Sequence, residues 1–263
     1  MTISASRGRW IRTGTALAML ALGGVLFVAG NTATAQESGE PSNNIADYVS
    51  SKLDDFTATI KVMQYDEAAG KKINRDFGRI YELQGDVNVH YKEENKLRLD
   101  ARMKTANVIF IINGTKQNVQ IPQVKINSIT DIGSAPGKRK TLLDVGLISD
   151  GYLAYSNVEY KGPSNVNGIP CAKFKFTYQD KSDSSHRIIW IDPKTKVTLK
   201  REDYSQLGKL NATFYYRDPK LVAPGVWFPT RIEVFNNEGQ KAGETAYKNV
   251  KVNQGVDDSL FKF

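Results

Sequence analysis

The segment that decides the fold is Arg187–Tyr216, RIIWIDPKTKVTLKREDYSQLGKLNATFYY. Two short apolar runs, Ile188–Ile191 and Val197–Leu199, flank the sequence DPKT. Asp followed by Pro suits a type I turn, because Pro presets φ at the first corner of the turn. The β-branched and aromatic residues on either side favour a half-buried pleated surface. We therefore predict a hairpin over Arg187–Asp203 and a further strand over Leu210–Tyr216.

A two-residue period continues through most of the remaining chain. In Lys96–Met103, for example, apolar side chains alternate with charged ones, which is typical of a strand with one buried face. Turn signals separate the strands, at Gly208, Asn113-Gly114, Asn167-Gly168, Gly162-Pro163 and Asn237–Gly239. The regular spacing predicts a mainly β fold of antiparallel strands. Besides the strands within Arg187–Tyr216, strands are expected at 56–65, 76–83, 86–91, 96–103, 108–112, 119–126, 152–160, 171–178, 227–235 and 242–252.

Only a few segments depart from the strand period. Near-helical spacing of apolar residues predicts a short amphipathic helix over Asn44–Leu53, and a second helix is expected over Thr141–Leu147. The polar sequence AAGKK at 68–72 is interpreted as a turn. Pro122 belongs on an edge or at a bulge of its strand. The stretch Asp131–Lys140, rich in Gly, Pro and basic residues, interrupts the sheet.

The N-terminus has the pattern of a secretory signal peptide. Three arginines precede an apolar run over Thr15–Gly30, and Ala33–Ala35 forms an A-x-A cleavage site. We predict cleavage after residue 35, a flexible N-terminus over 36–43 and a single domain over 44–263. An uncleaved membrane anchor is the competing interpretation, although the apolar run is short for a bilayer span. The protein is therefore expected to be exported, periplasmic and soluble.

Charge and cysteine content narrow the classes of partner. The formal net charge is +8, and loss of the three signal-peptide arginines leaves +5. Such an excess favours anionic surfaces in general, and no zinc-finger or RNP-like motif accompanies it, so nucleic acid is not expected as a partner. The single cysteine, Cys171, excludes an internal disulfide framework. It is expected to pack as a small apolar residue, with a reactive thiol as the alternative.

No set of residues in the sequence resembles a catalytic or metal-binding constellation. The two histidines, His90 and His186, lie far apart, and Ser184-Ser185-His186 is not part of a G-x-S-x-G motif. Two histidines and one cysteine make no zinc ligand set, and Asp180–Asp183 lacks the glycine and distal glutamate of an EF-hand loop. We therefore expect a non-enzymatic protein without a cofactor or metal. The charged residues of the hairpin over Arg187–Asp203, Arg201 among them, need no catalytic explanation.

Apolar residues are more abundant than one flat core requires. They fill the core of a closed or folded-over sheet, or they line a hydrophobic cavity in a strongly curved sheet whose mouth is covered by helices. Sequence does not separate a filled barrel from a hollow one. The candidate lining residues of such a cavity are Phe56, Leu97, Leu99, Met103, Phe110, Ile112, Phe174, Phe176, Trp190, Phe214, Tyr216 and Trp227.

Seven features in order resemble the outer-membrane lipoprotein carrier (LolA/LolB-like) family of the Lol system. They run from the predicted first helix to the C-terminus: Ala46–Val62, NKLRLD at 95–100, NVIFIING at 107–114, GIPCAK at 168–173, Trp190–Asp192, Phe228-Pro229 and VNQGVDDSLF at 252–261. The chain departs from the family in extra sequence around Ile121–Lys140, and in Tyr91–Asn95, which replaces an early proline-bearing strand motif. These departures concern the cargo more than the fold.

The resemblance implies an incomplete antiparallel barrel with helices as a lid over an apolar cavity. Its members carry lipoprotein acyl chains through the periplasm, or bind or sense lipids. By position, Arg98 matches the family arginine that holds the lid shut, while a simple ion pair with Asp100 or Glu93 is the alternative. The cluster Lys138-Arg139-Lys140 is a candidate contact for anionic headgroups or an acidic partner, or else a solvated loop.

These implications lead to one leading function and one alternative. The leading function is a monomeric periplasmic carrier of lipoprotein acyl chains, or of another lipid, that exchanges cargo with membrane-bound donor or acceptor proteins. The alternative is an envelope sensor or interaction protein that uses the same fold to bind lipid or unfolded outer-membrane protein.

Overall fold

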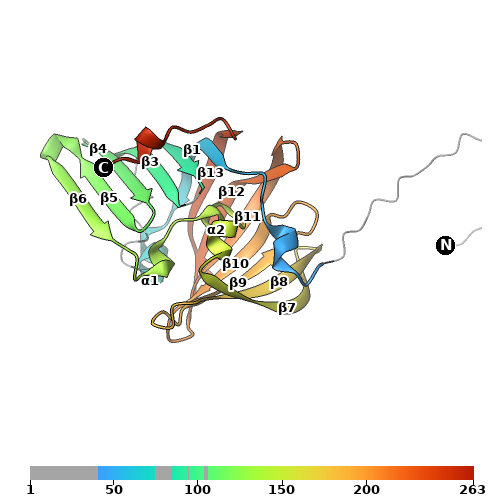
Figure 1. Cartoon of the computed structure of the whole chain (residues 1–263). Coiled ribbons are helices and arrows are strands. Elements are labelled where there is room, and N and C mark those ends of the chain that lie inside the picture. Colours follow the sequence, from blue (N-terminus) through green and yellow to red (C-terminus); the bar gives the residue numbers. More distant parts are fainter. Residues whose placement is uncertain (1–40, 75–76, 78–83, 94, 104–105) are drawn as a thin grey trace, which may run out of the picture. The chain divides into compact units, whose positions relative to one another are not determined.

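The computed structural model describes residues 41–74, 77, 84–93, 95–103 and 106–263. These residues form one antiparallel sheet of 13 strands in the order β6-β5-β4-β3-β2-β1-β13-β12-β11-β10-β9-β8-β7 (Figure 1). The strands are β1 (Asp55–Tyr65), β2 (Gln84–Lys92), β3 (Lys96–Met103), β4 (Ala106–Asn113), β5 (Lys116–Ile121), β6 (Ile126–Asp131), β7 (Ser156–Val166), β8 (Ile169–Tyr178), β9 (His186–Ile191), β10 (Thr198–Tyr204), β11 (Leu210–Ala223), β12 (Val226–Asn236) and β13 (Lys241–Val252).

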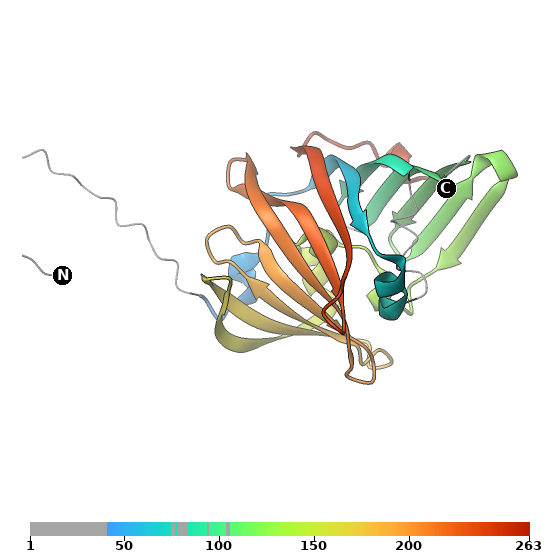
Figure 2. The ribbon, with the colours of Figure 1, turned by 180° about the vertical axis from the view of Figure 1, so that it is seen from behind.

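The order of the strands makes an incomplete barrel. Two meanders, β1–β6 and β7–β13, are joined side by side where β1 pairs with β13. Strands β6 and β7 are the two ends of the order, so the sheet does not close on itself. Both views show that β7–β13 are strongly curved (Figures 1 and 2). The predicted fold class, a mainly β incomplete antiparallel barrel with few helices, is confirmed.

The helices are short and lie between strands or at the chain ends. They are η1 (Ile45–Tyr48), α1 (Glu67–Ile73), η3 (Pro122–Val124), η4 (Pro136–Lys138), η5 (Leu142–Val145), α2 (Asp150–Leu153) and η6 (Asp258–Phe261), of which only α1 and α2 are α-helical. The connection from β6 to β7 contains η4, η5 and α2. This long connection positions the candidate site.

The hairpin predicted over Arg187–Asp203 is confirmed as β9 and β10. Asp192 organises its turn: the carboxylate accepts hydrogen bonds from the Lys194 amide (2.9 Å) and the Thr195 hydroxyl (2.7 Å). The backbone N–H of Asp192 donates to the Val197 carbonyl at 2.9 Å, which starts the ladder. The strand predicted over 210–216 is also present, although β11 continues to Ala223.

Several local predictions were wrong. The helix predicted over 44–53 is only the single 3₁₀ turn η1. The AAGKK segment lies within α1, because the Asp66 carboxylate caps the Ala69 amide and starts a helix there. Gly162-Pro163 is a bulge inside β7, where Gly162 has φ +97° and the pairing register shifts between Tyr160 and Pro163.

Other segments were divided differently from the prediction. The strand expected over 119–126 is broken at Pro122, which begins η3 and separates β5 from the edge strand β6. The strand expected from Tyr152 begins at Ser156, after α2. The strand predicted over 76–83 and the signal peptide over 1–35 lie outside the described residues.

The buried apolar side chains of the described residues form four clusters, and the first two make up the interior of the half-barrel. The first core lies on β1, β2, β11 and β12 and includes Phe56, Tyr216 and Phe228. The second core lies on β8 and β9, around Phe174 and Phe176. An outer cluster surrounds Trp190 on the opposite face of β8 and β9, and a C-terminal cluster joins Ile111 to Val256 and Phe261.

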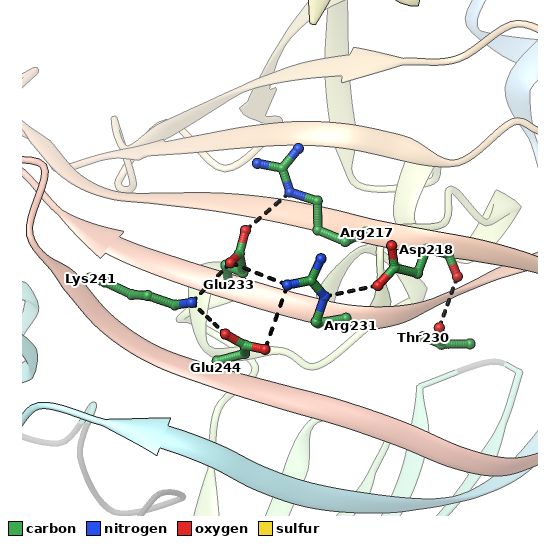
Figure 3. A network of polar contacts seen from close by, with 7 residues as sticks. All are labelled: Arg217, Asp218, Thr230, Arg231, Glu233, Lys241 and Glu244. Carbon is green, nitrogen blue, oxygen red and sulfur yellow. Dashed lines mark hydrogen bonds and ion pairs between the residues drawn. The ribbon is translucent and has the colours of Figure 1, made fainter. Parts of the chain in front are cut away.

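Charged residues cover the convex face of β11–β13. On β12, Arg231 and Glu233 alternate with the buried Ile232 and Val234. Figure 3 shows these charged side chains in one network, in which Arg231 lies 2.8 Å from Asp218 and Lys241 lies 2.9 Å from Glu233. Because this face is polar, the apolar faces of these strands belong to the interior.

Candidate functional site

Three short segments cover the interior of the half-barrel: η1, η5 and α2, which we call the lid. Tyr48 of η1 and Tyr152 of α2 are both 1% exposed and belong to the second core. The lid segments are joined to one another, because Val49 forms a parallel bridge with Ile148 and the Ser50 amide donates to the Ile148 carbonyl at 2.8 Å. The lid is therefore packed into the sheet and linked across the mouth.

The sequence TLLD at 141–144 determines η5. The Thr141 hydroxyl accepts a hydrogen bond from the Leu143 amide, and the Asp144 carboxylate accepts one from the Thr141 amide at 2.9 Å, which together make a capping box. Gly146 ends the turn with φ +83°. Within η5, Leu142 packs in the first core and Leu143 in the second. A single turn of chain thus joins the two interior cores.

Two buried side chains hold η5 through one carbonyl. The Leu143 oxygen accepts hydrogen bonds from the Tyr216 hydroxyl at 2.9 Å and from Arg201 Nη1 at 3.1 Å. Arg201 is 3% exposed and Tyr216 is 2% exposed, so both bonds are shielded from water. The Thr198 amide also donates to the Gly146 carbonyl at 2.8 Å. Strands β10 and β11 therefore latch the lid from beneath.

Charged residues gather around this latch. We call Lys140, Asp144, Arg187, Arg201 and Asp203 the lid charge cluster. Arg201 Nε lies 3.0 Å and Arg187 Nε 3.5 Å from Asp203 Oδ1. The Asp144 carboxylate lies 3.7 Å from Arg201 Nη1 and 3.8 Å from Lys140 Nζ. Arg187 also donates to the Tyr152 hydroxyl of the lid at 3.1 Å.

The lid carboxylate is held in its ionised form. Burial raises the pKa of Asp144, but the charges of Lys140, Arg201 and Arg187 and the hydrogen bond from the Thr141 amide outweigh this effect, so the pKa lies below its ordinary value. Burial raises the pKa of Tyr216, which keeps its hydroxyl protonated as a donor to the lid. The latch therefore combines ion pairs to the Asp144 carboxylate with two hydrogen bonds to the Leu143 carbonyl. One of these bonds comes from the neutral Tyr216 hydroxyl and the other from the charged Arg201 guanidinium.

The lowered pKa of Asp144 predicts an acid-sensitive lid. A carboxyl with a lowered folded-state pKa contributes stability that is fully present above its unfolded value and is lost as pH falls through the lowered value. The ordinary value is 3.8, so this loss occurs below about pH 4. We expect Asp144→Asn to flatten the dependence of the unfolding free energy on pH in that range, measured by urea titration from pH 6 to 2. Asp150→Asn, at an exposed lid position, should keep the wild-type slope; equal slopes for all three proteins would contradict the prediction.

The structure brings most of the predicted lining residues to the interior and separates others. Phe56, Leu97, Leu99, Phe214, Tyr216 and Trp227 belong to the first core or pack against it, and Phe174 and Phe176 belong to the second. Ile112 is buried, whereas Met103 and Phe110 are half-buried. By register, Leu97 faces Ile112 and Leu99 faces Phe110, which places these pairs on one face of β3 and β4.

Trp190 lies apart from the other aromatic residues. It sits in the outer cluster with Cys171, Leu199 and Val166, while its neighbours Ile189 and Ile191 face the second core. Its indole N–H donates to the Ser164 hydroxyl at 3.1 Å, and the ammonium groups of Lys173 and Lys200 lie 4.9 and 4.5 Å from its ring centroid. Trp190 is therefore part of the outer face and not of the interior.

Arg98 does not contact the lid. Its guanidinium binds the Asp100 carboxylate at 2.8 Å and donates to the Leu260 carbonyl of η6 at 3.2 Å. The ion pair with Asp100, considered as the alternative to a latch, is present. In the described part of the chain, Arg201 and not Arg98 makes the contacts that the latch role requires.

The basic cluster at 138–140 is not a uniform exposed patch. Arg139 is half-buried, donates to the Gly133 carbonyl at 3.2 Å and lies 4.7 Å from the Tyr155 ring centroid. Lys140 is exposed and pairs with Asp144. The side chain of Lys138 is outside the description. Contact with an anionic surface stays a prediction, and Lys140 is its best-placed member.

Sequence reasoning missed most of the latch. Arg201 was interpreted as a charged hairpin residue without a catalytic role, and Arg187, Leu143 and Asp144 were not among the candidate site residues. The pattern T-x-x-D followed by glycine two residues later is nevertheless a recognisable signal for a capped turn. Cys171 was interpreted correctly as a packed residue: it is 0% exposed, and burial raises its thiol pKa to about 11.

Two hollows on the surface of the described residues lie away from the lid. One of about 520 Å³ is lined by residues such as Thr213, Tyr215 and Phe235, and another of about 300 Å³ by residues such as Asp100 and Asn107. Among the described residues, no three His, Cys, Asp or Glu side chains are grouped to hold a metal. No described helix is long and apolar enough to cross a membrane.

Comparisons with known proteins agree with this architecture. A family model described as an uncharacterized protein matches residues 136–263, and no curated protein matches the sequence. A putative outer membrane lipoprotein-sorting protein domain from Vibrio parahaemolyticus has a TM-score of 0.57 at 12% identity, over 82% of this chain and 92% of that one. A LolA superfamily protein from Nitrosomonas europaea has a TM-score of 0.56 at 15% identity, over 83% and 94%.

A third solved structure extends the comparison. A DUF1329 family protein from Desulfovibrio piger has a TM-score of 0.53 at 12% identity, over 84% of this chain and 98% of that chain. At these identities the likeness establishes a shared fold. The resemblance inferred from sequence motifs is thus confirmed at the level of architecture.

Proposed function

We propose that this protein is a non-enzymatic carrier that binds the acyl part of a lipid or lipoprotein inside its half-barrel. The observation that supports this most directly is the lid, since it covers aromatic and aliphatic residues of two cores and is held largely through the Leu143 carbonyl. The lid side chains Tyr48, Leu142, Leu143 and Tyr152 are buried within these cores, so cargo enters by displacing the lid. The LolA-like fold is consistent with this role.

The burial free energies of the lid and of an acyl chain are similar in size. Burial of an acyl chain is worth about 0.8 kcal/mol per CH₂, or roughly 10 kcal/mol gross for a chain of about sixteen carbons. The displaced lid gives back the burial of Leu142, Leu143, Tyr48 and Tyr152, each worth about 1.5–3 kcal/mol. The two contributions are similar in size, so loading and release are both accessible once a membrane or partner protein competes for the cargo.

The latch gives a direct test of lid opening. Tyr216→Phe removes one buried hydrogen bond to Leu143 at a cost of about 1 kcal/mol, which raises the open fraction about fivefold. We expect the affinity for an uncharged fluorescent long-chain lipid to increase by the same factor, measured by titration at fixed pH.

The neighbouring tyrosine supplies a matched control. Tyr215 is on the opposite face of β11, where its ring contacts Phe235 edge-on at 5.6 Å and Arg217 lies 4.5 Å from its centroid. Tyr215→Phe should leave lipid affinity unchanged. The carrier proposal would be refuted if no lipid can be extracted from the purified wild-type protein and if neither it nor either variant takes up the probe. Recovery of a membrane-bound regulator by pull-down without lipid transfer would favour an envelope sensor instead.

A further inference from the structure

The interior beneath the lid contains two arginines from neighbouring strands. Arg187 of β9 pairs with Asp203 in the ladder, and Arg201 of β10 pairs with Ile189. The Arg201 guanidinium carbon lies 3.9 Å from the ring centroid of Phe214, and that of Arg187 lies 5.9 Å from the ring of Tyr178. Arginine stays protonated in proteins, so two fixed positive charges adjoin the aromatic face proposed to receive acyl chains.

The charges around this point do not balance once the lid has gone. With the lid closed, the two arginines Arg187 and Arg201 face two carboxylates, Asp144 and Asp203, while Lys140, which also pairs with Asp144, is exposed to solvent. Asp144 belongs to η5 and leaves with the lid, so opening leaves two arginines and a single carboxylate. A cation left unpaired is costly once cargo buries it again, so the interior favours cargo that brings an anion.

Hydrogen-bond donors are also left over. Arg201 Nε lies 3.0 Å from Asp203 Oδ1, yet neither atom makes a well-formed hydrogen bond. In the closed state Arg201 Nη1 and the Tyr216 hydroxyl both donate to the Leu143 carbonyl, and opening of the lid frees these two donors as well. The closed lid thus places a carbonyl oxygen, with the Asp144 carboxylate beside it, where these donors converge.

We propose that the cargo is an anionic amphiphile whose carboxylate or phosphate replaces the Leu143 carbonyl and the Asp144 carboxylate at Arg201, Arg187 and Tyr216. Its acyl chain then takes the place of the lid side chains against Phe174 and Phe176. This inference rests on the proposed carrier function and specifies its ligand. A neutral acyl ester leaves the second arginine without a counter-charge and binds more weakly.

Matched pairs of ligands test the charge. Dodecanoate and dodecanol share one chain, and at pH 8 the acid is ionised; lauroyl lysophosphatidate and monolaurin repeat the comparison with a phosphate. Affinities are measured by displacement of a neutral fluorescent probe. We expect the wild-type protein to bind at least one anion about tenfold or more tightly than its neutral partner, the range for a charge-assisted hydrogen bond. The pair that shows the larger ratio distinguishes carboxylate from phosphate.

Substitutions locate the effect. Arg201→Gln removes the latch and the anion contact together, so we expect affinity for dodecanol to rise while the anion preference falls to about threefold or less. Arg201→Lys should restore part of the preference. Arg187→Gln provides the same reading if Arg201→Gln does not fold. Lys200→Gln, next in sequence but packed against Trp190 on the outer face, should keep the full preference.

Each result decides between the claims. Equal affinities for the anion and its neutral partner in both pairs, measured on the wild-type protein, would overturn the anionic cargo while leaving lipid carriage intact. A preference that persists in both Arg201→Gln and Arg187→Gln would overturn the assigned site. Failure of all four ligands to bind, even to Tyr216→Phe, would overturn the carrier function and this inference with it.

Discussion

Gly146→Ala is expected to lower the free energy of unfolding by about 2–4 kcal/mol, a large part of the 5–15 kcal/mol typical of a domain. Gly146 has φ +83°, a conformation that costs an L-residue about 1–2 kcal/mol. A Cβ at this position would also lie 2.6 Å from Cδ1 of Tyr216, which is itself fixed by its bond to Leu143. Ring and lid cannot both keep their places, so η5 is expelled or Tyr216 loses its hydrogen bond.

Gly208 is the matched control for this substitution. It has φ +71°, but nothing lies within 4 Å of the point that a Cβ would occupy, so Gly208→Ala should cost only about 1 kcal/mol. Urea unfolding curves of the two variants measure the difference. If the carrier proposal holds, Gly146→Ala also binds lipid more readily than the wild-type protein, because its closed state is destabilised. Equal stability of the two variants would show that the lid does not pack on Tyr216.

The second large effect is expected at the C-terminus. Phe261→Ala should destabilise the protein by about 3–5 kcal/mol, the usual cost of removing a buried aromatic side chain. Phe261 is 0% exposed and packs with Ile111 and Val256 against β4. The Phe261 carbonyl accepts a hydrogen bond from the side-chain amide of Asn113 at 3.2 Å, and the Leu260 carbonyl accepts one from Arg98. The segment is thus a strap across β3 and β4.

Phe263, two residues further on, makes a clean comparison. It is 42% exposed, and Phe263→Ala should change stability by less than about 0.5 kcal/mol. Thermal denaturation of both variants, followed by circular dichroism, tests the contrast. Similar melting temperatures would mean that η6 is not part of the cooperative fold. If instead Phe261→Ala lowers the melting temperature, Arg98→Leu is expected to report on this strap and not on lid release.

The sequence was sufficient for the fold class but not for the side-chain direction on which the site depends. Alternation alone predicts the faces of β8 and β9 well. Trp190 was nevertheless assigned to the interior because it is aromatic. Trp190 is one residue out of phase with Ile189 and Ile191. The aromatic ring is shielded on the outer face by two lysines, a contact that depends on cross-strand neighbours and not on local pattern.

Arg201 illustrates a second limit. Thr198 pairs with Ile191 and faces inward, so strict alternation would point Lys200 inward and Arg201 outward. The register shift between Thr198 and Lys200 reverses this phase and directs Arg201 to the lid. A bulge of this kind has no signal in the sequence around Leu199. The predicted latch, Arg98, lacks such a shift and stays on the face that the C-terminal strap covers.

Helix signals were weaker still because they compete with tertiary contacts. The apolar spacing over 44–53 matched a helix, but the segment turns after Tyr48 to form a bridge with Ile148. In contrast, a capping aspartate at position 66 was enough to make a helix of a segment interpreted as a turn. Local caps and long-range pairing, and not periodicity alone, decided these short elements.

The placement of Leu142 and Leu143 in different cores has a kinetic consequence. Neighbouring Cα atoms are only ~3.8 Å apart, so η5 cannot leave one core and remain in the other. Opening is then one concerted event, and every molecule that enters must wait for it. Uptake would rise with ligand concentration only until it reaches the opening rate, and beyond that point the protein itself, and not the supply of lipid, would set the pace of delivery.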